Sequence, residues 1–531
     1  MKKCATSFEN VRFLLFTVAI KQFFCKKVFM VRFSLLLLFV YSFQVGYSQN
    51  KKVYKPSMQT CNCNFKIDSS YMASVPARLK ADSTFPYNND SSFRTICGYL
   101  IVPENRRKAS SGMIRLPFIV LKSKNPDKKQ DPLLFTTGGP GGSSLGWING
   151  MQKSSVIESR DCIAFEQRGT QFAIPSLRSF ELDTAIREAY RKNLNKDSMW
   201  LEGVKRYKKK LEKKGIDLSG YNTDETVADI IDLLKVLKID SVNLYGVSYS
   251  GGLMLAVLQK EPSKVRSLVL DSPLPTFVPI DEEEPMNFVK AIAVLSGHCE
   301  KDSSNQQRYG SLATRFENYF NSIADKKFYF PYVEKGTVDT LQVEYTKNEL
   351  LDLLDNTLQD ASAIKNVPFM ITEMISGNHA PYIQKKLDDI FNKNIAPNGM
   401  RISVYCADQA NYHSEERIQQ LWRLYPLLSG YHINDVYKAF CDCWKVPPVN
   451  VQTRQPFHSN KPVLIGDGEM DPACSPLYMS RIKQYMPNAQ CFLFINRSHG
   501  VGGATFRQMA QTFLDDPYHR IQSHNEKVIA Y

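Results

Sequence analysis

The sequence predicts an α/β fold: a mostly parallel central sheet with helices on both faces, interrupted by a large, mainly helical insertion. In the first half of the chain, apolar segments with helical spacing alternate with short apolar strands. Two further apolar strands, 461–465 and 491–495, lie near the C-terminus. Residues 276–455 separate the two groups and are too many for a simple connection. We therefore expect one core from residues 96–275 and 456–531, with residues 276–455 as a cap.

The N-terminus is predicted to be an export signal. Basic residues precede an apolar run over 33–45, and a short polar segment follows it, which is the layout of a signal peptide. The run is short for a membrane span, so an uncleaved anchor is the less favoured alternative. Met30 can serve as the true start, because the chain from Met30 onwards makes a complete signal peptide alone. We assign residues 1–49 to this leader and 50–95 to a polar lead-in. The expected protein is exported, periplasmic or secreted, without a stable membrane anchor after cleavage.

Charge and cysteine content are compatible with export and give no sign of a nucleic-acid partner. The net charge is +14, of which the leader carries +6. The densest basic run, 205–214, is predicted to be a solvated helix face, because no nucleic-acid-binding motif accompanies it. Ten of the 12 cysteines follow the leader, and an even number in an exported chain suggests disulfides. The C-x-C spacings are wrong for a structural zinc site, so we expect no metal.

The first candidate site element is a glycine-rich loop after an early strand. Residues 133–136 are predicted as the strand, and Thr137-Gly138-Gly139-Pro140-Gly141-Gly142-Ser143 follows. Residues without side chains let the backbone approach a substrate closely. A phosphate-binding loop is the rival interpretation, but it requires a following Gly-Lys-Ser/Thr, which the sequence does not have there. We therefore expect the Gly139 N–H to stabilise an oxyanion and Gly138 and Gly141 to contact substrate, without a cofactor.

The run Gly246-Val247-Ser248-Tyr249-Ser250 has the form of a nucleophile elbow, the strand-to-helix turn on which α/β-hydrolases carry their serine. A strand is predicted before it and a helix after it, and Thr223 is the predicted N-cap of the helix upstream. The turn exposes the Ser248 hydroxyl and tolerates only small residues two places to either side, here Gly246 and Ser250. The Tyr249 N–H is the second expected oxyanion donor.

The partners of Ser248 are expected on loops after the two C-terminal strands. His499 is the only one of eight histidines that directly follows a strand and has glycine next to it. Among Asp467, Glu469 and Asp471 we prefer Asp471 as the acid, because it ends its loop and a proline fixes the chain after it. The histidine would take the serine proton, and the acid would hold the imidazole tautomer. The chain order Ser, Asp, His is that of α/β-hydrolases.

With these motifs assembled, the sequence resembles the prolyl and tripeptidyl aminopeptidase group of α/β-hydrolases. The Gly138-Gly139-Pro140-Gly141-Gly142 loop carries most of the resemblance. Phe165-Glu166-Gln167-Arg168-Gly169-Thr170 resembles the family's Asp-Gln-Arg-Gly segment. The segments Cys406-Ala407-Asp408 and Cys443-Trp444 resemble a paired-cysteine feature of the tripeptidyl branch. The resemblance covers the chain from about Cys97 to near the C-terminus.

Three residues depart from the family pattern. Glu166 stands where aspartate is usual, which we expect to lengthen a structural salt bridge. Ser250 replaces a glycine of the elbow, and Cys474 occupies a threonine position in the loop that supports the acid. These departures bear on the rate more than on the reaction type.

The resemblance implies a serine exopeptidase that acts near the free N-terminus of short peptides through an acyl-enzyme. A free amino terminus needs an acidic partner, and we select Asp408 from the cap carboxylates, which include Asp281, Glu282, Glu283 and Glu284. A carboxylester or other acyl hydrolase with the same triad is the first alternative, since fold does not fix substrate. A non-catalytic binding protein on the same fold is the second, and the intact serine, aspartate and histidine argue against it.

Overall fold

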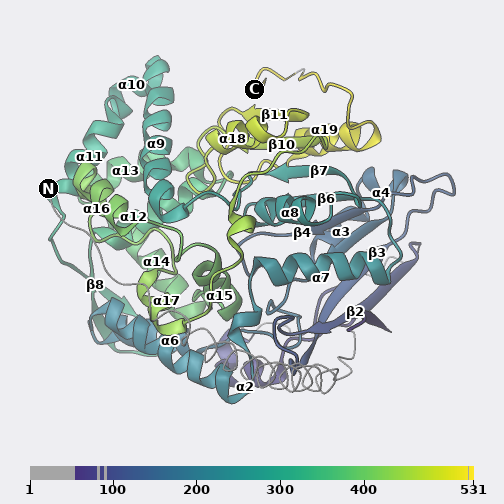
Figure 1. Ribbon diagram of the computed structural model, residues 1–531. Helices are drawn as coiled ribbons and strands as arrows, with labels where there is room; N and C mark the ends of the chain where they lie inside the picture. The colour runs from purple at the N-terminus through teal and green to yellow at the C-terminus, as the bar shows by residue number, and fades with distance from the viewer. Residues whose placement is uncertain (1–53, 81–83, 89–91, 524) are drawn as a thin grey trace, which may run out of the picture. The chain divides into compact units, whose positions relative to one another are not determined.

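The computed structural model describes residues 54–531 except 81–83, 89–91 and 524; the expected leader, 1–49, lies outside this part. In the described chain, ten strands form one sheet in the order β1-β2-β3-β5-β4-β6-β7-β10-β11-β12 (Figure 1). The strands are β1 Ser57–Cys61, β2 Thr95–Pro103, β3 Met113–Leu121, β4 Leu133–Thr136, β5 Cys162–Phe165, β6 Val242–Val247, β7 Val265–Asp271, β10 Val463–Gly468, β11 Ala489–Phe494 and β12 Val528–Ala530.

The centre of the sheet is parallel and its edges are antiparallel. Strands β5, β4, β6, β7, β10 and β11 pair in parallel as neighbours, as predicted. Strands β1 to β3 at one edge and β12 at the other pair antiparallel. The central strands are buried along almost their whole length, as expected for a sheet covered on both faces. Their carboxyl ends meet at one edge, where loops can converge on a ligand.

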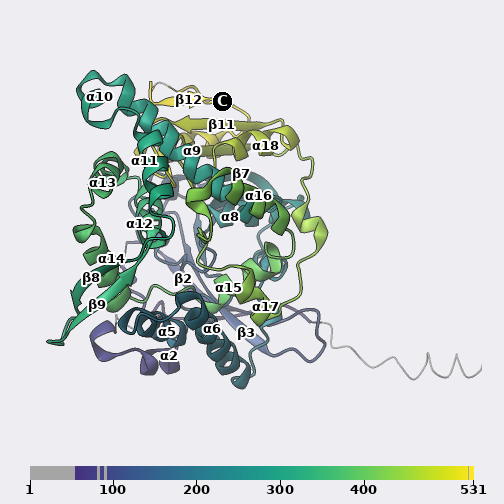
Figure 2. The ribbon, with the colours of Figure 1, turned by 90° about the vertical axis from the view of Figure 1, so that its left-hand side faces the viewer.

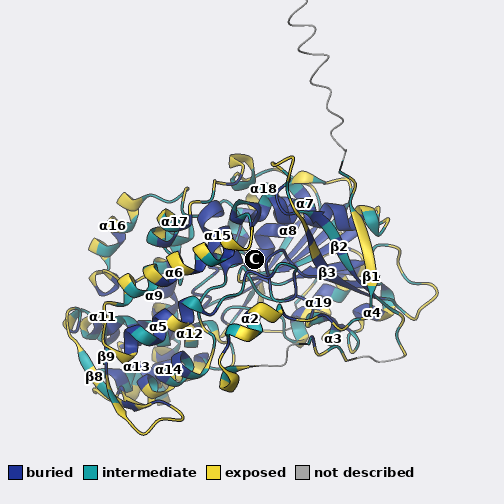
Figure 3. Cartoon of the chain, turned by 90° about the horizontal axis from the view of Figure 1, so that it is seen from below, coloured by how far each residue is buried: buried dark blue, intermediate teal, exposed yellow. Residues whose placement is uncertain are grey.

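Helices cover both faces of this sheet, which confirms the predicted α/β architecture. Figure 3 shows α7, α8 and α18 on one face and α3, α4 and α19 on the other. On the second face, Phe506 and Phe513 of α19 share a buried apolar cluster with Val269 of β7 and Leu464 of β10. The bounds are α3 Trp147–Met151, α4 Val156–Ser159, α7 Thr223–Val236, α8 Tyr249–Lys260, α18 Leu477–Tyr485 and α19 Ala504–Asp515.

The chain between β7 and β10 forms the mainly helical cap, with one small hairpin, β8 Phe328–Val333 and β9 Thr340–Tyr345. Two helices from the core segment, α5 Glu181–Arg191 and α6 Lys196–Lys213, pack beside it, α5 against α14 and α6 against α17 (Figure 2). The cap helices are α9 Ile280–Lys301, α10 Ser303–Tyr309, α11 Leu312–Ser322, α12 Lys347–Gln359, α13 Val367–Ile375, α14 Ala380–Asn392, α15 Gly399–Asp408, α16 Glu415–Leu424 and α17 Lys438–Trp444; a short helix of the lead-in, α2, spans Ser69–Ser74.

The N-cap prediction at α7 was wrong by one residue. Asn222 is the cap, because its side chain accepts a hydrogen bond from the Glu225 N–H at 3.0 Å. The Thr223 hydroxyl is used elsewhere, since it lies 2.6 Å from Tyr249 Oη. Thr223 is therefore the first residue of the helix, and its side chain belongs to the surroundings of the elbow.

Two disulfides join described segments of the chain. Cys63–Cys97 ties the lead-in to β2, and Cys406–Cys441 ties α15 to α17. Cys443, which the resemblance associated with Cys406, is a free cysteine. Helix residues two apart do not face the same neighbour, so only one of Cys441 and Cys443 can meet Cys406. No helix of the described residues is both long and apolar enough to span a membrane.

Candidate active site

Ser248 lies at the turn between β6 and α8 with φ 58° and ψ −127°. This conformation is strained for a residue with a side chain and persists only where the surrounding fold imposes it. Gly246 makes the turn possible, because a Cβ atom there would lie 2.2 Å from Ser250 O. The Ser250 side chain fits in place of the usual glycine, since its hydroxyl donates to Thr137 O and accepts from Gln167 Nε2 at 3.0 Å. The elbow keeps its geometry despite this departure.

The glycine loop after β4 lies directly against the elbow. A Cβ atom on Gly138 would lie 2.7 Å from Ser248 Cβ and 3.2 Å from Tyr249 N. The Gly138 carbonyl accepts from Gly142 N–H at 3.2 Å, which turns the N–H of the same peptide, that of Gly139, the opposite way. Among the described residues nothing accepts from Gly139 N–H. Tyr249 N–H lies in the first turn of α8, where no helical acceptor exists. Both N–H groups can therefore bind a ligand oxygen.

His499 and Asp471, which follow β11 and β10, form a hydrogen-bonded pair. His499 Nδ1 lies 2.7 Å from Asp471 Oδ2. The other oxygen, Oδ1, accepts from the N–H groups of Ala473 at 2.9 Å and Cys474 at 2.8 Å. Burial lowers the pKa of His499, but the Asp471 carboxylate outweighs that effect, so this pKa lies above its ordinary value. The fixed carboxylate holds the proton on Nδ1 and leaves Nε2 as an acceptor.

The two other acids of this loop do not contact His499. Asp467 Oδ1 accepts from Gly468 N–H at 2.7 Å, and burial raises the pKa of Asp467 well above its ordinary value. Glu469 Oε2 lies 3.0 Å from Nε2 of a different histidine, His298. The structure therefore brings Asp471, the preferred acid, to His499 and leaves Asp467 as a buried, neutral neighbour.

Cys474 lies beside Ser248, with its Sγ 4.0 Å from Ser248 Oγ. Burial raises the pKa of Cys474 well above that of an ordinary thiol, so the group stays protonated and uncharged. Ser248 forms no hydrogen bond with His499 in this structure, although both residues line one cavity. Catalytic hydrogen bonds of this kind commonly close only in the substrate complex.

Glu166 does not form the salt bridge that we expected. Its carboxylate accepts from the N–H groups of Ser144 at 2.9 Å and Phe172 at 3.2 Å, and from the Ser143 hydroxyl at 3.0 Å. No basic side chain pairs with it in the described chain, and burial raises the pKa of Glu166. The prediction was wrong because the partners are backbone N–H groups and a hydroxyl. Glu166 therefore holds the far end of the glycine loop.

A cavity of about 1600 Å³ joins these residues to the cap. This volume exceeds the roughly 300–1,000 Å³ of common ligand sites, so the cavity has room for an extended molecule. Gly141, predicted to contact substrate, is not among the lining residues; its carbonyl accepts from Asn398 Nδ2 at 3.1 Å. The core side of the cavity is lined by Gly138, Gly139, Ser248, Tyr249, Cys474 and His499.

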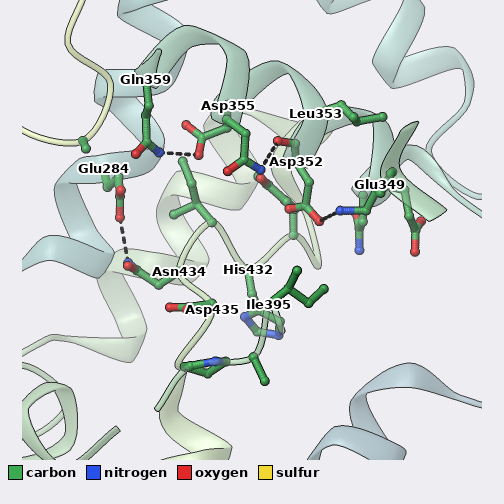
Figure 4. Close-up of a pocket in the computed structure, with 18 of the residues that line it drawn as sticks. Glu284, Glu349, Asp352, Leu353, Asp355, Gln359, Ile395, His432, Asn434 and Asp435 are labelled. Carbon is green, nitrogen blue, oxygen red and sulfur yellow. Dashed lines mark hydrogen bonds and ion pairs between the residues drawn. The ribbon is translucent and has the colours of Figure 1, made fainter. Parts of the chain in front are cut away.

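Two buried carboxylates of the cap also line this cavity. Glu284 on α9 accepts from Asn434 Nδ2 at 2.7 Å, and Asp355 on α12 accepts from Gln359 Nε2 at 2.7 Å (Figure 4). Neither forms an ion pair with a described residue. Burial raises the pKa of Glu284 well above its ordinary value and that of Asp355 to about 7, and neighbouring carboxylates add to both effects. A cation that enters the cavity would meet two acids with no cation of their own.

Asp408, the predicted amine partner, also lines the cavity, and its Oδ2 accepts a hydrogen bond from the Thr223 hydroxyl. Burial raises the pKa of Asp408 to about 7. The sequence reasoning included Glu284 among the cap acids but missed Asp355 and Arg401, which line the same cavity. Both lie on ordinary amphipathic helices, where an inward polar residue has no sequence signature of its own.

Two family models of known proteins match parts of this chain. A family model described as "alpha/beta hydrolase fold" matches residues 131–291, and one described as "TAP-like protein" matches residues 425–520. The chain has the α/β-hydrolase fold, and its C-terminal part is similar to TAP-like proteins. A search of curated proteins finds no match. In this α/β-hydrolase, the first matched segment contains the glycine loop and Ser248, and the second contains Asp471 and His499.

Solved structures with a detectable likeness to the hydrolase include peptidases and esterases. A proline iminopeptidase from Mycobacterium smegmatis is 13% identical and aligns over 79% of this chain and 98% of its own, with a TM-score of 0.37. A proline iminopeptidase-related protein from Thermus thermophilus is 12% identical over 80% and 99%, with a TM-score of 0.36. A thermophilic esterase from Thermogutta terrifontis is 12% identical over 79% and 99%, also at 0.36.

Proposed function

We propose that this hydrolase is a serine exopeptidase that cleaves short peptides near their free N-terminus. Ser248 Oγ attacks the carbonyl carbon as its proton passes to Nε2 of His499. Asp471 holds the imidazole tautomer and stabilises the imidazolium. The tetrahedral oxygen accepts from the N–H groups of Gly139 and Tyr249. His499 then gives its proton to the leaving amine, and water repeats the sequence on the acyl-enzyme.

The observation that carries the exopeptidase assignment is the pair of cap carboxylates without a cation. Glu284 and Asp355 line the cavity that holds Ser248, and Asp355 is near enough to the catalytic pair for its charge to raise the pKa of His499. An ammonium group taken out of water needs an anionic partner, and a buried carboxylate needs a cationic one. A peptide with a free N-terminus satisfies both, whereas an uncharged ester satisfies neither.

Asp408 remains a proposed contact of the substrate amine, but we rank it after Glu284 and Asp355. One of its oxygens already accepts from Thr223, but the other, Oδ1, is buried without a hydrogen-bond partner among the described residues. A third carboxylate in the cavity lining favours a ligand with more than one donor.

The test is a matched substrate panel with three variants. Peptide p-nitroanilides of one to three residues, each free or N-acetylated, are compared with a simple p-nitrophenyl ester. Ser248→Ala reports the nucleophile, and a fluorophosphonate probe checks whether Ser248 is labelled. Glu284→Gln reports the amine site, with Glu283→Gln as its control, because Glu283 is the neighbouring residue on α9 and pairs with Arg481 at 2.7 Å.

We expect the free-amine peptides to be cleaved at least tenfold better than their acetylated forms, since a factor of ten corresponds to only about 1.4 kcal/mol. Glu284→Gln should reduce this preference, and Glu283→Gln should not. Equal cleavage of free and blocked peptides would overturn the exopeptidase assignment. Ester hydrolysis without peptide cleavage would support the carboxylester alternative, and a probe-resistant, inactive protein would support the non-catalytic one.

We also propose that the hydrolase is exported, to the periplasm or the medium. The two disulfides support this proposal, because structural disulfides persist in oxidising compartments. The predicted leader supplies the route. The expected mature protein begins close to Asn50.

A further inference from the structure

One cap helix, α15, contacts both parts of the chain that supply the proposed oxyanion donors. At its N-terminal end, Arg401 Nη1 donates to Gly139 O, and Asn398 Nδ2 donates to Gly141 O at 3.1 Å. The fit is close, because a Cβ atom on Gly141 would lie 2.6 Å from Asn398 Nδ2. Two carbonyls of the glycine loop are therefore held by the cap rather than by the core.

The other end of α15 contacts the elbow through a short relay. Asp408 accepts from the Thr223 hydroxyl, and Thr223 Oγ1 lies 2.6 Å from Tyr249 Oη. Since Thr223 gives its single proton to Asp408, Tyr249 donates to Thr223. Tyr249 is the residue whose N–H is the second proposed donor. Helix α15 is thus connected to the residues of both proposed donors, one at each of its ends.

Helix α15 is itself held in place by contacts with α17 and with Tyr207 of α6. The Cys406–Cys441 disulfide ties it to α17, and Figure 2 shows the two helices side by side. Trp444 Nε1 donates to Ser403 Oγ at 2.7 Å, and both residues are buried. At its first turn, Gly399 N–H donates to Tyr207 Oη at 2.7 Å.

The glycine loop needs such a support. Gly139 and Gly141 have φ of +119° and +106°, and glycine loses more conformational freedom on ordering than any other residue. Within the loop, the Gly142 N–H to Gly138 O bond is the one backbone hydrogen bond present in the described chain. Oxyanion stabilisation depends on donors that are already in place before the reaction. Contacts from outside the loop must therefore set the position of Gly139.

We propose that Arg401 is a positioning residue that fixes the Gly139 donor by holding the Gly139 carbonyl. The proposal rests on the proposed serine hydrolase function. Arg401 is itself oriented by Asp435, whose Oδ1 lies 2.5 Å from Arg401 Nε. The planar guanidinium makes both contacts at once, which a lysine ammonium on a flexible stem cannot reproduce. The cap thereby sets the geometry of the reaction centre as well as the shape of the substrate cavity.

The test compares Arg401→Met and Arg401→Lys with Arg417→Ala, a control on the cap surface where Arg417 pairs with Glu282 at 3.0 Å. Asn398→Asp is a second variant of the loop contact, because it keeps an acceptor for the Arg401 N–H but cannot donate to Gly141 O. Each variant is checked for folding by circular dichroism. The readouts are kcat and KM on a free-amine peptide, and inhibition by a peptide boronate and by the product peptide.

We expect Arg401→Met to lower kcat by on the order of 10- to 100-fold, less than the roughly 100- to 1,000-fold cost of deleting a donor. KM should stay within about threefold, and Arg401→Lys should recover part of the loss. The boronate, whose tetrahedral adduct places an oxygen between the two donors, should bind more weakly by the same factor as kcat. The product peptide should bind as it does to the wild type.

Unchanged kcat in Arg401→Met, or equal weakening of boronate and product, would overturn the proposal. A readout independent of activity is hydrogen exchange at residues 138–142, which should quicken in Arg401→Met and Asn398→Asp but not in Arg417→Ala. If the wild-type protein proves inactive toward the whole panel, the proposed function fails. The exchange experiment still decides whether Arg401 holds the loop.

Discussion

Replacement of Asp471 by asparagine is the sharpest test of the proposed catalytic pair, because the structure fixes which way the new amide must point. Asp471 Oδ1 accepts from two backbone N–H groups, those of Ala473 and Cys474. The asparagine oxygen must take this place, which turns its NH₂ group toward His499 Nδ1. His499 Nδ1 would then accept a hydrogen bond from this NH₂ group, and the imidazole proton would move to Nε2. An Nε2–H cannot take the proton of Ser248.

The expected loss follows from this change of tautomer. With geometry intact and the wrong tautomer present, a Ser-His-Asp site loses about 10⁴-fold in kcat, or roughly 5.5 kcal/mol at 1.36 kcal/mol per tenfold. The assay is kcat/KM on a free-amine peptide p-nitroanilide, with circular dichroism to confirm that the variant is folded. Asp467→Asn is the matched control. Burial keeps Asp467 protonated, and an amide has the shape of a neutral carboxyl group. We expect it to lose less than about tenfold.

Two outcomes would refute this reasoning. If Asp471→Asn keeps more than about a tenth of wild-type activity, the pair at 2.7 Å is structural and the base has another partner. If Asp467→Asn is the inactivating change, Asp467 is the acid of the triad and the assignment of Asp471 is wrong.

The same structure makes four further predictions. Ser248→Gly should be more stable to urea than Ser248→Ala by up to about 2.5 kcal/mol, because glycine relieves backbone strain of roughly 1–3 kcal/mol at φ 58° and costs about 0.5–1 kcal/mol in the unfolded chain. If Ser248→Gly is instead less stable by about 0.5–1 kcal/mol, the turn is unstrained. KM for free-amine peptides should fall as pH rises through about 7, where Asp355 ionises. It should rise again above about 8, where the substrate amine loses its proton. Neither Asp355→Asn with free-amine peptides nor the wild type with acetylated peptides should show the decrease in KM near pH 7. Thiol titration of the unreduced mature protein, without the leader, should count two reactive cysteines when native, Cys61 and Cys443, and six when denatured, because the other four free cysteines of the described chain are buried. Ten reactive thiols in the mature protein would remove the support for export. N-terminal sequencing of protein from the native host should give a start close to Asn50, and an intact leader would contradict the cleavage prediction.

Much of the proposed site could be predicted because each part depends on residues that lie close together in the sequence. The elbow needs Gly246 and Ser248 at fixed spacing, and the glycine loop needs residues that accept φ values of +119° and +106°. Asp471 and His499 each follow a strongly apolar strand, so their place at the carboxyl edge of the sheet follows from the pattern. Requirements of this kind produce short residue patterns that can be recognised in a single sequence.

The cap side of the site could not be predicted in the same way. Asp355 and Arg401 come from two helices whose relative placement depends on packing across many residues. On an amphipathic helix, an acid that faces a cavity has the same spacing as one that faces water. The error at Glu166 has a similar origin. A carboxylate that binds backbone N–H groups and one that binds an arginine cannot be distinguished from residue type alone.

The interrupted core has a consequence for when activity can begin. Ser248 and the glycine loop precede the cap in the chain, whereas Asp471 and His499 lie in loops after two strands that follow it. About 250 residues separate the nucleophile from its base, which is roughly 10–50 s of synthesis at 5–20 residues per second. During that time the emerging chain carries a serine without a base. If the proposed triad is correct, a hydrolase built in this order cannot act before β10 and β11 have docked.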